Sequence, residues 1–310
     1  MREPSLVGWE PGRPLEIIAG TPRDGGQDRA ARALAPALEE VIDVPVSVSN
    51  VPGRGGGNAW DLLATYAGDA HRVSISSPTL ITNTLNNVAD LGHGDVTQLG
   101  LLCTEYIAFA VPTGSPISSP TELLDALAGP NPPVVSLATA WGNVNHIAVT
   151  YLCEHLGVDP RAVQVRVFDS ARHAIADALE TPGGIAAVSA ASVLPELRDG
   201  SIRVIATSAP TRLGDQLSSI QTWTELGVDC VIGTWRGLVG PPELSAEAVA
   251  LWDATLSSAI ATESWRSALI EHNWTDSFLM SAETESFIRT QEVQMQDALR
   301  SLSDGEQPLA

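Results

Sequence analysis

The chain has 310 residues, of which 44% are hydrophobic, enough for one large or two ordinary domains around a substantial core. Its formal net charge at pH 7 is −20 and its 17 basic residues are all arginines, with no run of them that could form a nucleic-acid groove. The same charge disfavours an acidic membrane surface, and no apolar stretch approaches the roughly 20 residues of a membrane helix, so we expect a soluble protein.

Three cysteines and the N-terminal segment bear on the compartment. Cys103, Cys153 and Cys230 are far apart and share no C-x-x-C spacing, so no local metal cluster or redox pair is indicated. Three buried thiols are the favoured interpretation, and one disulfide with one free thiol is the alternative in an oxidising compartment. The first 13 residues lack the apolar core of a signal peptide. The residues alone leave cytoplasmic and exported locations both open.

Short apolar runs alternate with helical periodicity from Leu15 onward, which is typical of β-α units around a mainly parallel sheet. The apolar stretch 96–112 interrupts this pattern and ends in PTGSPISSP. Such a stretch can pass from one sheet into another, so we place a domain transition near Val111. Before it, the pattern predicts strands at 15–20, 44–50 and 72–77 and helices over 30–41 and 58–68.

A second α/β pattern follows the transition. It predicts helices over 121–129, 145–157 and 171–180, and strands at 132–140, 162–168, 183–189 and 202–208. After PTRLGDQ the sequence pattern changes again to a mainly helical one, and helices are expected at 245–261, 263–272 and 281–302.

The order of these patterns predicts an α/β fold with two lobes. A chain that leaves one lobe, builds a second and returns makes two crossings with a cleft between the lobes. Lobe 1 is assigned to 14–110 and 210–303 and lobe 2 to 111–209. The termini are assigned to a lead-in at 1–13 and a frayed tail at 304–310. The two hinge crossings are placed near 105–112 and 205–212.

The turn at 20–28, between the first strand and the first helix, is the first candidate site. Gly25 and Gly26 let the backbone approach a ligand, and the N–H groups at the start of the next helix favour an anion. Asp28 is expected to be the helix N-cap. Turn chemistry without a ligand is the alternative, and the residues leave the two interpretations even.

The segment NVPGRGGGNAW at 50–60 invites a dinucleotide interpretation. It lacks the third Gly of G-x-G-x-x-G and the Lys-Ser/Thr of a phosphate-binding loop, so a bound cofactor is disfavoured and none is predicted. Arg54 could bind a carboxylate as a fork, but a solvated loop arginine is the more frequent case.

The third candidate is LATAWGNVNH at 137–146, before a second-lobe helix. Thr139 offers a hydroxyl, Trp141 a flat apolar face and Gly142 a close backbone approach. His146 could act as a base, but no nucleophile is adjacent to it, and a structural hydrogen bond is favoured.

Signatures of catalysis and of metal binding are scarce. The sequence holds no G-x-S-x-G elbow, no S-x-x-K and no cysteine in a strand-to-helix turn with a matching histidine. Its six histidines are scattered and form no H-x-x-x-H pair. No catalytic residue and no metal ligand is therefore predicted.

Five segments, taken in order, resemble a known family. They are PLEIIAGTPRDGGQDRAARALAPAL, VPVSVSNVPGRGGGNAWDLLA, GNVNHIAVTYLCEHLGV, LRDGSIRVIATSAPTRL with TWTELGVD, and TWRGLVGPPELSAEAV. From about Arg13 to Leu299 the chain resembles the solute receptors of tripartite tricarboxylate transporters, the Bug-type extracytoplasmic binding proteins. The most specific pieces are the G-G-x-D-x-x-A-R turn and the N-x-P-G-x-G-G-x-x-A segment, each preceded by a strand.

The resemblance implies a non-enzymatic receptor with a type II, Venus-flytrap periplasmic-binding-protein fold. Such a receptor closes on a small carboxylated solute, which could be a di- or tricarboxylate, an aromatic acid or an amino acid. It delivers the solute to the permease subunits of a membrane transporter and binds no nucleic acid. The implied location is periplasmic or extracytoplasmic, with a signal segment removed from this chain.

The resemblance also implies that the turns 21–28 and 139–146 grip a carboxylate from opposite sides. Backbone N–H groups, hydroxyls and ordered waters would supply the contacts. Ser76, Ser77 and Ser189, at other strand ends, are secondary candidates whose alternative role is turn capping. The expected ligand-binding residues are Thr21, Pro22, Arg23, Asp24, Gly25, Gly26, Gln27, Asp28, Ser76, Ser77, Thr139, Ala140, Trp141, Gly142, Asn143, His146, Ser189 and Arg236.

Several of these residues depart from the family pattern. Family members usually carry Gly-Gly-x-Thr-Asp in the first turn, whereas here Asp24 stands at the first Gly and Gln27 at the Thr. Ala140 and Trp141 replace smaller residues, and Trp141 could stack on a planar solute. Arg236, like Arg54, stands where small and aromatic residues are frequent.

Two rival functions remain open. One is an α/β enzyme that acts on an acyl or phosphorylated substrate in the same cleft, with His146 as base. The other is a sensory ligand-binding protein.

Overall fold

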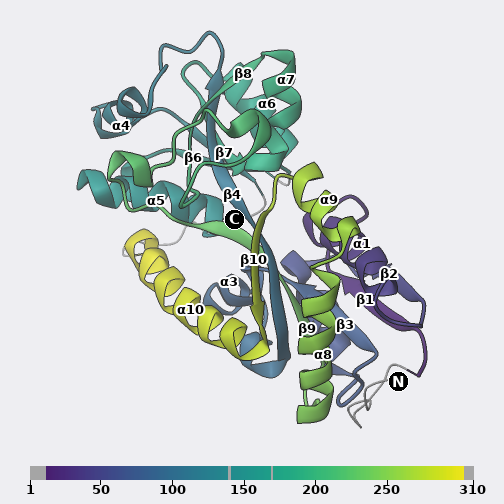
Figure 1. Ribbon diagram of the computed structural model, residues 1–310. Helices are drawn as coiled ribbons and strands as arrows, with labels where there is room; N and C mark the ends of the chain where they lie inside the picture. The colour runs from purple at the N-terminus through teal and green to yellow at the C-terminus, as the bar shows by residue number, and fades with distance from the viewer. Residues whose placement is uncertain (1–11, 139–140, 169, 304–310) are drawn as a thin grey trace. The chain divides into compact units, whose positions relative to one another are not determined.

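The computed structural model describes residues 12–138, 141–168 and 170–303 (Figure 1). The chain divides into two compact units. The described part of unit 1 is 12–103, 235–271 and 276–291, and that of unit 2 is 104–234, 272–275 and 292–303. The lobe boundaries and hinge crossings expected from the sequence stay a prediction. The lead-in and tail expected at 1–13 and 304–310 lie outside the described residues, apart from residues 12 and 13.

Unit 1 is built on a mixed sheet in the strand order β2-β1-β3-β9-β4. Strand β1 pairs in parallel with β2 and β3, β9 runs antiparallel to β3, and β10 pairs with β4. Both β4 and β9 continue into unit 2. The bounds are β1 (Leu15–Ala19), β2 (Val46–Asn50), β3 (Arg72–Ser76), β4 (Thr97–Pro112), β9 (Gly233–Gly240) and β10 (Thr275–Met280).

The apolar run in β1 explains its central place in this sheet. Ile17, Ile18 and Ala19 are all fully buried, as expected for a parallel strand covered on both faces. Edge strand β2 instead alternates Val and Ser and remains partly exposed. The strands predicted at 15–20, 44–50 and 72–77 are confirmed as β1, β2 and β3.

Helix α1 packs on this sheet through its small and apolar positions. Ala30, Leu34, Ala37 and Leu38 lie at helical spacing and are fully buried. The bounds are α1 (Gly26–Glu39), α2 (Gly57–Ala64), α3 (Thr79–Leu85), α8 (Ala246–Ala259), α9 (Glu263–Glu271), α10 (Ser281–Ser303), and the 3-10 turns η1 (Arg54–Gly56) and η2 (His93–Asp95). Residues 292–303 of α10 belong to unit 2.

Unit 2 has a sheet in the order β4-β7-β5-β6, with β8 also paired to β4. Strands β7, β5 and β6 are parallel, and β4 is antiparallel to β7 and β8. The long apolar stretch forms the single 16-residue strand β4. The bounds of the other strands are β5 (Val135–Ala138), β6 (Val165–Phe168), β7 (Ile185–Ser189) and β8 (Ile202–Thr207).

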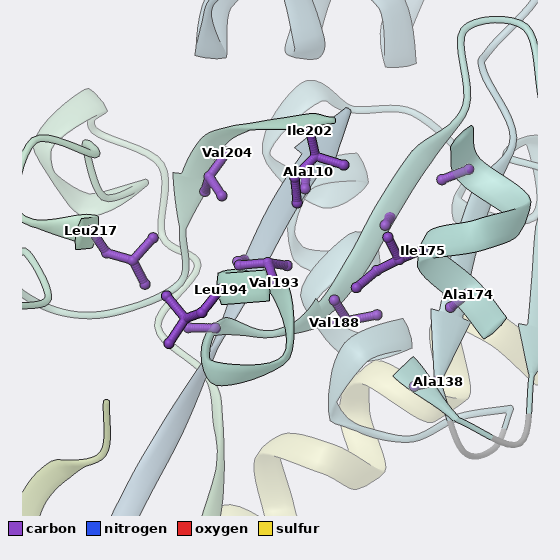
Figure 2. Packing of buried hydrophobic residues seen from close by; sticks show 14 of the residues in the cluster. Ala110, Ala138, Ala174, Ile175, Val188, Val193, Leu194, Ile202, Val204 and Leu217 are labelled. Atoms are coloured by element: carbon purple, nitrogen blue, oxygen red, sulfur yellow. The ribbon is translucent and has the colours of Figure 1, made fainter. Parts of the chain in front are cut away.

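The core of unit 2 lies where α6 meets the sheet. Figure 2 shows Ile175 of α6 and Val188 of β7 in a cluster with Val193 and Ile202, all buried. Serine caps fix two helix starts, since Ser119 accepts from the N–H of Glu122 and Ser170 from that of His173. The bounds are α4 (Pro120–Ala128), α5 (Val144–Leu156), α6 (Ala171–Glu180), α7 (Leu194–Asp199), η3 (Pro160–Ala162), η4 (Ala190–Val193), η5 (Asp215–Leu217) and η6 (Thr224–Leu226).

Some sequence expectations about the elements were wrong. The helix predicted over 58–68 ends at Ala64, where the Thr65 hydroxyl donates to the Leu62 carbonyl and closes the turn. Strands β9 and β10 and helices α3 and α7 were not predicted. Cys103, Cys153 and Cys230 are buried thiols, which confirms the favoured interpretation of the sequence. None of the helices in the described part of the chain combines the length and apolarity needed to cross a membrane.

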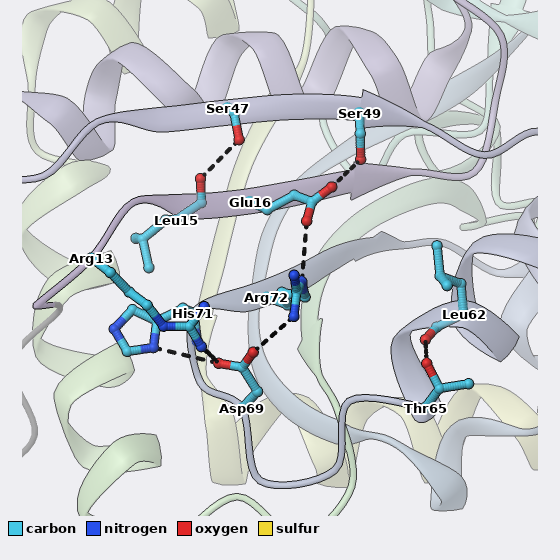
Figure 3. A network of polar contacts seen from close by, with 10 residues as sticks. All are labelled: Arg13, Leu15, Glu16, Ser47, Ser49, Leu62, Thr65, Asp69, His71 and Arg72. Atoms are coloured by element: carbon cyan, nitrogen blue, oxygen red, sulfur yellow. Dashed lines mark hydrogen bonds and ion pairs between the residues drawn. The ribbon is translucent and has the colours of Figure 1, made fainter.

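A charged network joins the segment before β1 to the turn before β3 (Figure 3). Asp69 accepts hydrogen bonds from Arg13 Nη2 at 2.5 Å, Arg72 Nη1 at 3.1 Å and the His71 N–H at 3.1 Å. Burial would raise the pKa of Asp69, but these donors outweigh it and lower the pKa. Glu16 accepts from Arg72 Nε at 3.2 Å and extends the network onto β1.

We expect Asp69→Ala to lower the free energy of unfolding by about 1 kcal/mol, because the network is only partly shielded from water. Urea denaturation measures this change. Asp125→Ala, which removes an exposed carboxylate on α4, serves as the control and should change stability by less than about 0.5 kcal/mol. Equal effects of the two substitutions would contradict the prediction.

Candidate functional site

The turn at 20–28 follows the carboxyl end of β1 and leads into α1. The N-cap of α1 is Gly25, with an extended backbone and no side-chain cap. Asp28, expected as the N-cap, lies instead in the first helical turn, so that assignment was wrong. Its N–H donates to Thr21 Oγ1 at 3.1 Å, whereas the N–H groups of Gly26 and Gln27 have no acceptor among the described residues. Two backbone donors and the positive end of the helix dipole thus remain for an anion.

Asp28 is fully buried and ties the turn to its neighbours. Its carboxylate accepts from Arg32 Nε at 3.0 Å, from Asn50 Nδ2 at 2.8 Å and from the Asp24 N–H at 2.9 Å. Asn50 Nδ2 also donates to the Thr21 carbonyl at 2.9 Å. Burial would raise the pKa of Asp28, but these hydrogen bonds outweigh it and hold the pKa below its ordinary value. Asp28 therefore acts as an anchor of the turn.

Gln27 is 2% exposed and is held between three loops. Its Oε1 accepts from the Gly20 N–H at 2.8 Å, and its Nε2 lies 3.4 Å from both the Gly55 carbonyl and Ser77 Oγ. Ser77 Oγ is in turn 2.8 Å from Thr79 Oγ1, which donates to the Gly55 carbonyl at 2.6 Å. The amide that departs from the family pattern thus serves to fix the first turn against its neighbours.

The residues at the tip of the first turn are exposed, unlike the buried Gln27 and Asp28. Pro22, Arg23 and Asp24 are exposed. Asp24 has a φ of 66°, in the left-handed region that aspartate tolerates better than most residues with a side chain. Its backbone conformation therefore gives a local reason for an acid at this position.

The glycine-rich segment at 53–57 packs directly on the first turn. A Cβ at Gly20 would lie 2.5 Å from the Cα of Gly56, so the two backbones approach as only glycines allow. Arg54 is exposed, donates to Asn58 Oδ1 at 2.8 Å and pairs with Asp61, as expected of a solvated loop arginine. Loop-to-loop packing thus accounts for glycines that could suggest a phosphate site.

Arg236 of β9 is brought to the start of α1. It is 8% exposed, and a Cβ on Gly26 would lie 2.3 Å from its Nη2. Ser76, at the end of β3, is fully buried, and its Oγ has no partner among the described residues. Gly237, which follows Arg236, is the strand partner of Ser76. The structure therefore brings Arg236 and the first turn together, with Ser77 beside Gln27.

The second candidate turn precedes α5 in unit 2. Thr139 and Ala140 lie outside the described residues. Asn143 is the N-cap of α5, and its Oδ1 accepts from the N–H groups of Asn145 at 3.0 Å and His146 at 3.2 Å. The Nδ2 groups of Asn143 and Asn145 both donate to the carbonyl of Ala138. These side chains hold the turn to the end of β5.

His146 is 4% exposed, and its Nδ1 accepts from the Gly142 N–H at 3.1 Å. This contact confirms the structural hydrogen bond favoured from the sequence. Burial lowers the pKa of His146 to about 4, so the imidazole is neutral at pH 7 with its proton on Nε2. Such a group is a weak proton acceptor at neutral pH, which gives little support to a role as general base.

Trp141 and Ser189 complete the predicted set. Trp141 is 41% exposed and meets the His146 ring edge to face, with centroids 5.3 Å apart. Ser189 ends β7 and is the N-cap residue of η4, and its Oγ is 2.7 Å from that of Ser192. The Ser189 side chain makes no capping hydrogen bond, so its contact with Ser192 does not bear out the capping role that was its alternative.

Sequence reasoning missed three polar residues that hold the first turn. Arg32 and Asn50 bind the Asp28 carboxylate, and Thr79 joins Ser77 to the Gly55 carbonyl. A signal existed for Asn50, because it is the last residue of the strand parallel to β1 and pairs in register with Ala19. No group of three or more His, Cys, Asp and Glu side chains in the described ranges is arranged to hold a metal ion.

The family model of the tripartite tricarboxylate transporter family receptor matches residues 30–302. The chain belongs to this family. It is 23% identical over 274 residues to protein BugT of Bordetella pertussis, with 82% of this chain and 78% of BugT covered.

Solved structures agree with the fold. A TctC solute-binding protein from Polaromonas superposes with a TM-score of 0.77 at 22% identity, covering 94% of this chain and 99% of the other. Rpa4515 of R. palustris, solved with adipate, gives a TM-score of 0.80 at 17% identity, covering 94% and 97%. The chain therefore has the two-lobed α/β fold of periplasmic binding proteins.

Proposed function

We propose that this chain is an extracytoplasmic receptor that captures a small carboxylated organic acid. It then delivers the acid to the membrane subunits of a tripartite tricarboxylate-type transporter. The start of α1 carries this proposal, because the N–H groups of Gly26 and Gln27 have no acceptor among the described residues. An uncapped helix start binds a carboxylate without an ion pair. The adipate bound to Rpa4515, a protein of the same fold, supports the ligand class.

The proposal gives the remaining candidates distinct roles. Asp28 and Gln27 hold the first turn in shape, and the exposed residues 22–24 border it. Arg236 adds a guanidinium beside Gly26, which favours a negatively charged ligand at this end of α1. A role in solute binding for the turn before α5, with Trp141 among its residues, stays a prediction from the sequence.

Isothermal titration of the purified chain with adipate, malate and benzoate tests the binding role. We expect at least one of these acids to bind, and to raise the free energy of unfolding by about 2.7 kcal/mol when present at 100 times its Kd. Gly26→Ala should weaken this binding at least tenfold, because its Cβ forces the Arg236 guanidinium away from the start of α1. Gly114→Ala, where a Cβ meets nothing within 4 Å, is the matched control and should bind as wild type does.

Two outcomes would overturn the proposal. One is the absence of binding by every carboxylate tested. The other is consumption of a bound acid in the same titration, because that would favour the rival enzyme.

Solute uptake into vesicles that contain the membrane subunits tests delivery. Uptake that does not depend on added receptor would favour a sensory role instead.

A further inference from the structure

Acidic side chains outnumber basic ones so strongly that more than half of them cannot form ion pairs. The chain has 37 aspartates and glutamates against 17 basic residues, and its formal net charge at pH 7 is −20. Even if every basic residue paired with a different carboxylate, 20 carboxylates would be left over. Because a small domain is well soluble at a net charge of magnitude about 2 to 8, solubility alone does not require this excess.

The basic residues are all arginines, and several of them are held against carboxylates. Arg32 pairs with the buried Asp28, and Arg72 joins Glu16 to Asp69. The planar guanidinium binds a carboxylate more firmly than the flexible, strongly hydrated ammonium of lysine does. The chain therefore keeps the cation that forms ion pairs and lacks the one that would serve as a solvated surface charge.

Three helices end on exposed glutamates. Glu40 is the C-cap of α1, Glu180 is the last residue of α6 and Glu271 is the last residue of α9, and the last turn of each helix holds no basic residue. None of the three carboxylates forms an ion pair within the described ranges. The C-terminus of a helix is the negative end of its dipole, so it repels a carboxylate. These helix ends are therefore unfavourable in dilute buffer.

Salt acts differently on these exposed charges and on the buried ones. Like charges gather at the end of α1, where Glu39, Glu40 and Asp43 are all exposed. The range of such repulsion falls from about 10 Å at 0.1 M salt to about 3 Å at 1 M. The hydrogen bonds of the fully buried Asp28 carboxylate are screened much less. Salt therefore weakens the unfavourable interactions of this surface and leaves the anchoring ones in place.

We propose that this chain is adapted to fold in concentrated salt and that it loses stability in dilute buffer. Cations of the salt gather around the unpaired carboxylates and screen their repulsion, so the folded state is favoured as the salt concentration rises. Glu40, Glu180 and Glu271 contribute strongly, because each meets a helix dipole in addition to the net charge of the chain. This salt requirement does not depend on the receptor function.

Thermal unfolding followed by circular dichroism at pH 7, in about 0.1 M and about 3 M KCl, tests this inference. We expect the apparent midpoint to be higher by at least about 8 °C in the concentrated salt. A smaller rise overturns the inference. KCl is used because sulfate and phosphate also strengthen the burial of apolar surface.

A double variant, Glu180→Gln with Glu271→Gln, tests the cause of the salt effect with one substitution in each unit. It should raise the midpoint by about 3 °C in dilute salt and by less than about 1 °C in concentrated salt. The matched control is Glu285→Gln with Asp297→Asn, again one in each unit. The control changes the net charge equally but removes carboxylates that each pair with an arginine. It should move the midpoint by less than about 1 °C at either concentration.

Two results with the variants would overturn the inference. One is an equal salt response of wild type and the variant without the two helix-end glutamates. That result would assign the salt effect to apolar burial or to chloride bound at the start of α1. The other is an equal rise of the midpoint in the control variant, because the repulsion would then not arise at the unpaired carboxylates.

Discussion

Asp28→Ala is expected to lower the free energy of unfolding by about 3 kcal/mol. The carboxylate is fully buried and accepts from Arg32, Asn50 and the Asp24 N–H. Its removal deprives three part-buried hydrogen bonds of their acceptor at once. Asn50 Nδ2 donates both to this carboxylate and to the Thr21 carbonyl. Because the substitution removes one of these two acceptors, the start of α1 should also shift and carboxylate affinity should fall.

Urea denaturation at pH 7 measures the loss, and Asp297→Ala provides the comparison. Asp297 also pairs with an arginine, Arg300, but both side chains are more than 60% exposed, so that change should be within about 0.5 kcal/mol. Asp28→Asn keeps the shape and one acceptor oxygen, and should fall between the two. If Asp28→Ala were as mild as Asp297→Ala, the anchoring role of Asp28 would be wrong.

Acidification is expected to destabilise the wild-type chain by about 3 kcal/mol more than the His146→Asn variant between pH 7 and pH 4. Burial lowers the pKa of His146 from 6.5 to about 4 in the folded chain. As the pH falls below 6.5 the unfolded chain takes up a proton that the folded chain does not, so unfolding becomes more favourable. Below about pH 4 both states are protonated, and this contribution to the pH dependence ends.

The comparison of variants isolates His146 from other groups. Asp28 also has a lowered pKa, so its stabilising contribution is lost as the pH falls. This loss is the same in wild type and in His146→Asn, so it cancels in the comparison. His173→Asn, at an exposed position on α6, should follow the wild-type curve. Parallel stability curves for wild type and His146→Asn from pH 7 to pH 4 would show that the imidazole is not held neutral.

The parallel strands could be predicted from the sequence because their apolar runs are compact and separated by clear helical periods. Strand β9, GTWRGLVG, could not, since its partner β3 lies about 160 residues earlier and a mixed run with three glycines carries no local strand signal. The burial of two polar side chains, Arg236 and Ser76, depends on the pairing of β9 with β3. Local sequence patterns therefore could not predict that these side chains are buried.

The two turns show a similar division. Glycines and an aspartate between strand and helix located the first turn, but they could not distinguish a cap at Asp28 from one at Gly25. Gly25 caps with its backbone alone, so the pattern holds no side-chain signal for it. In the second turn, the absence of a nucleophile adjacent to His146 favoured a structural hydrogen bond. Its partner, the Gly142 N–H, required the turn geometry at a φ of 72°.

The three buried thiols have a consequence for handling this protein. Burial raises the pKa of Cys153 to about 11, so roughly one thiol in ten thousand is ionised at pH 7, and the pKa of Cys230 is raised as well. Alkylating reagents are therefore expected to react very slowly with these thiols in the folded chain. The rate at which Cys153 and Cys230 are modified therefore measures how often unit 2 unfolds locally. No engineered label is needed for this measurement.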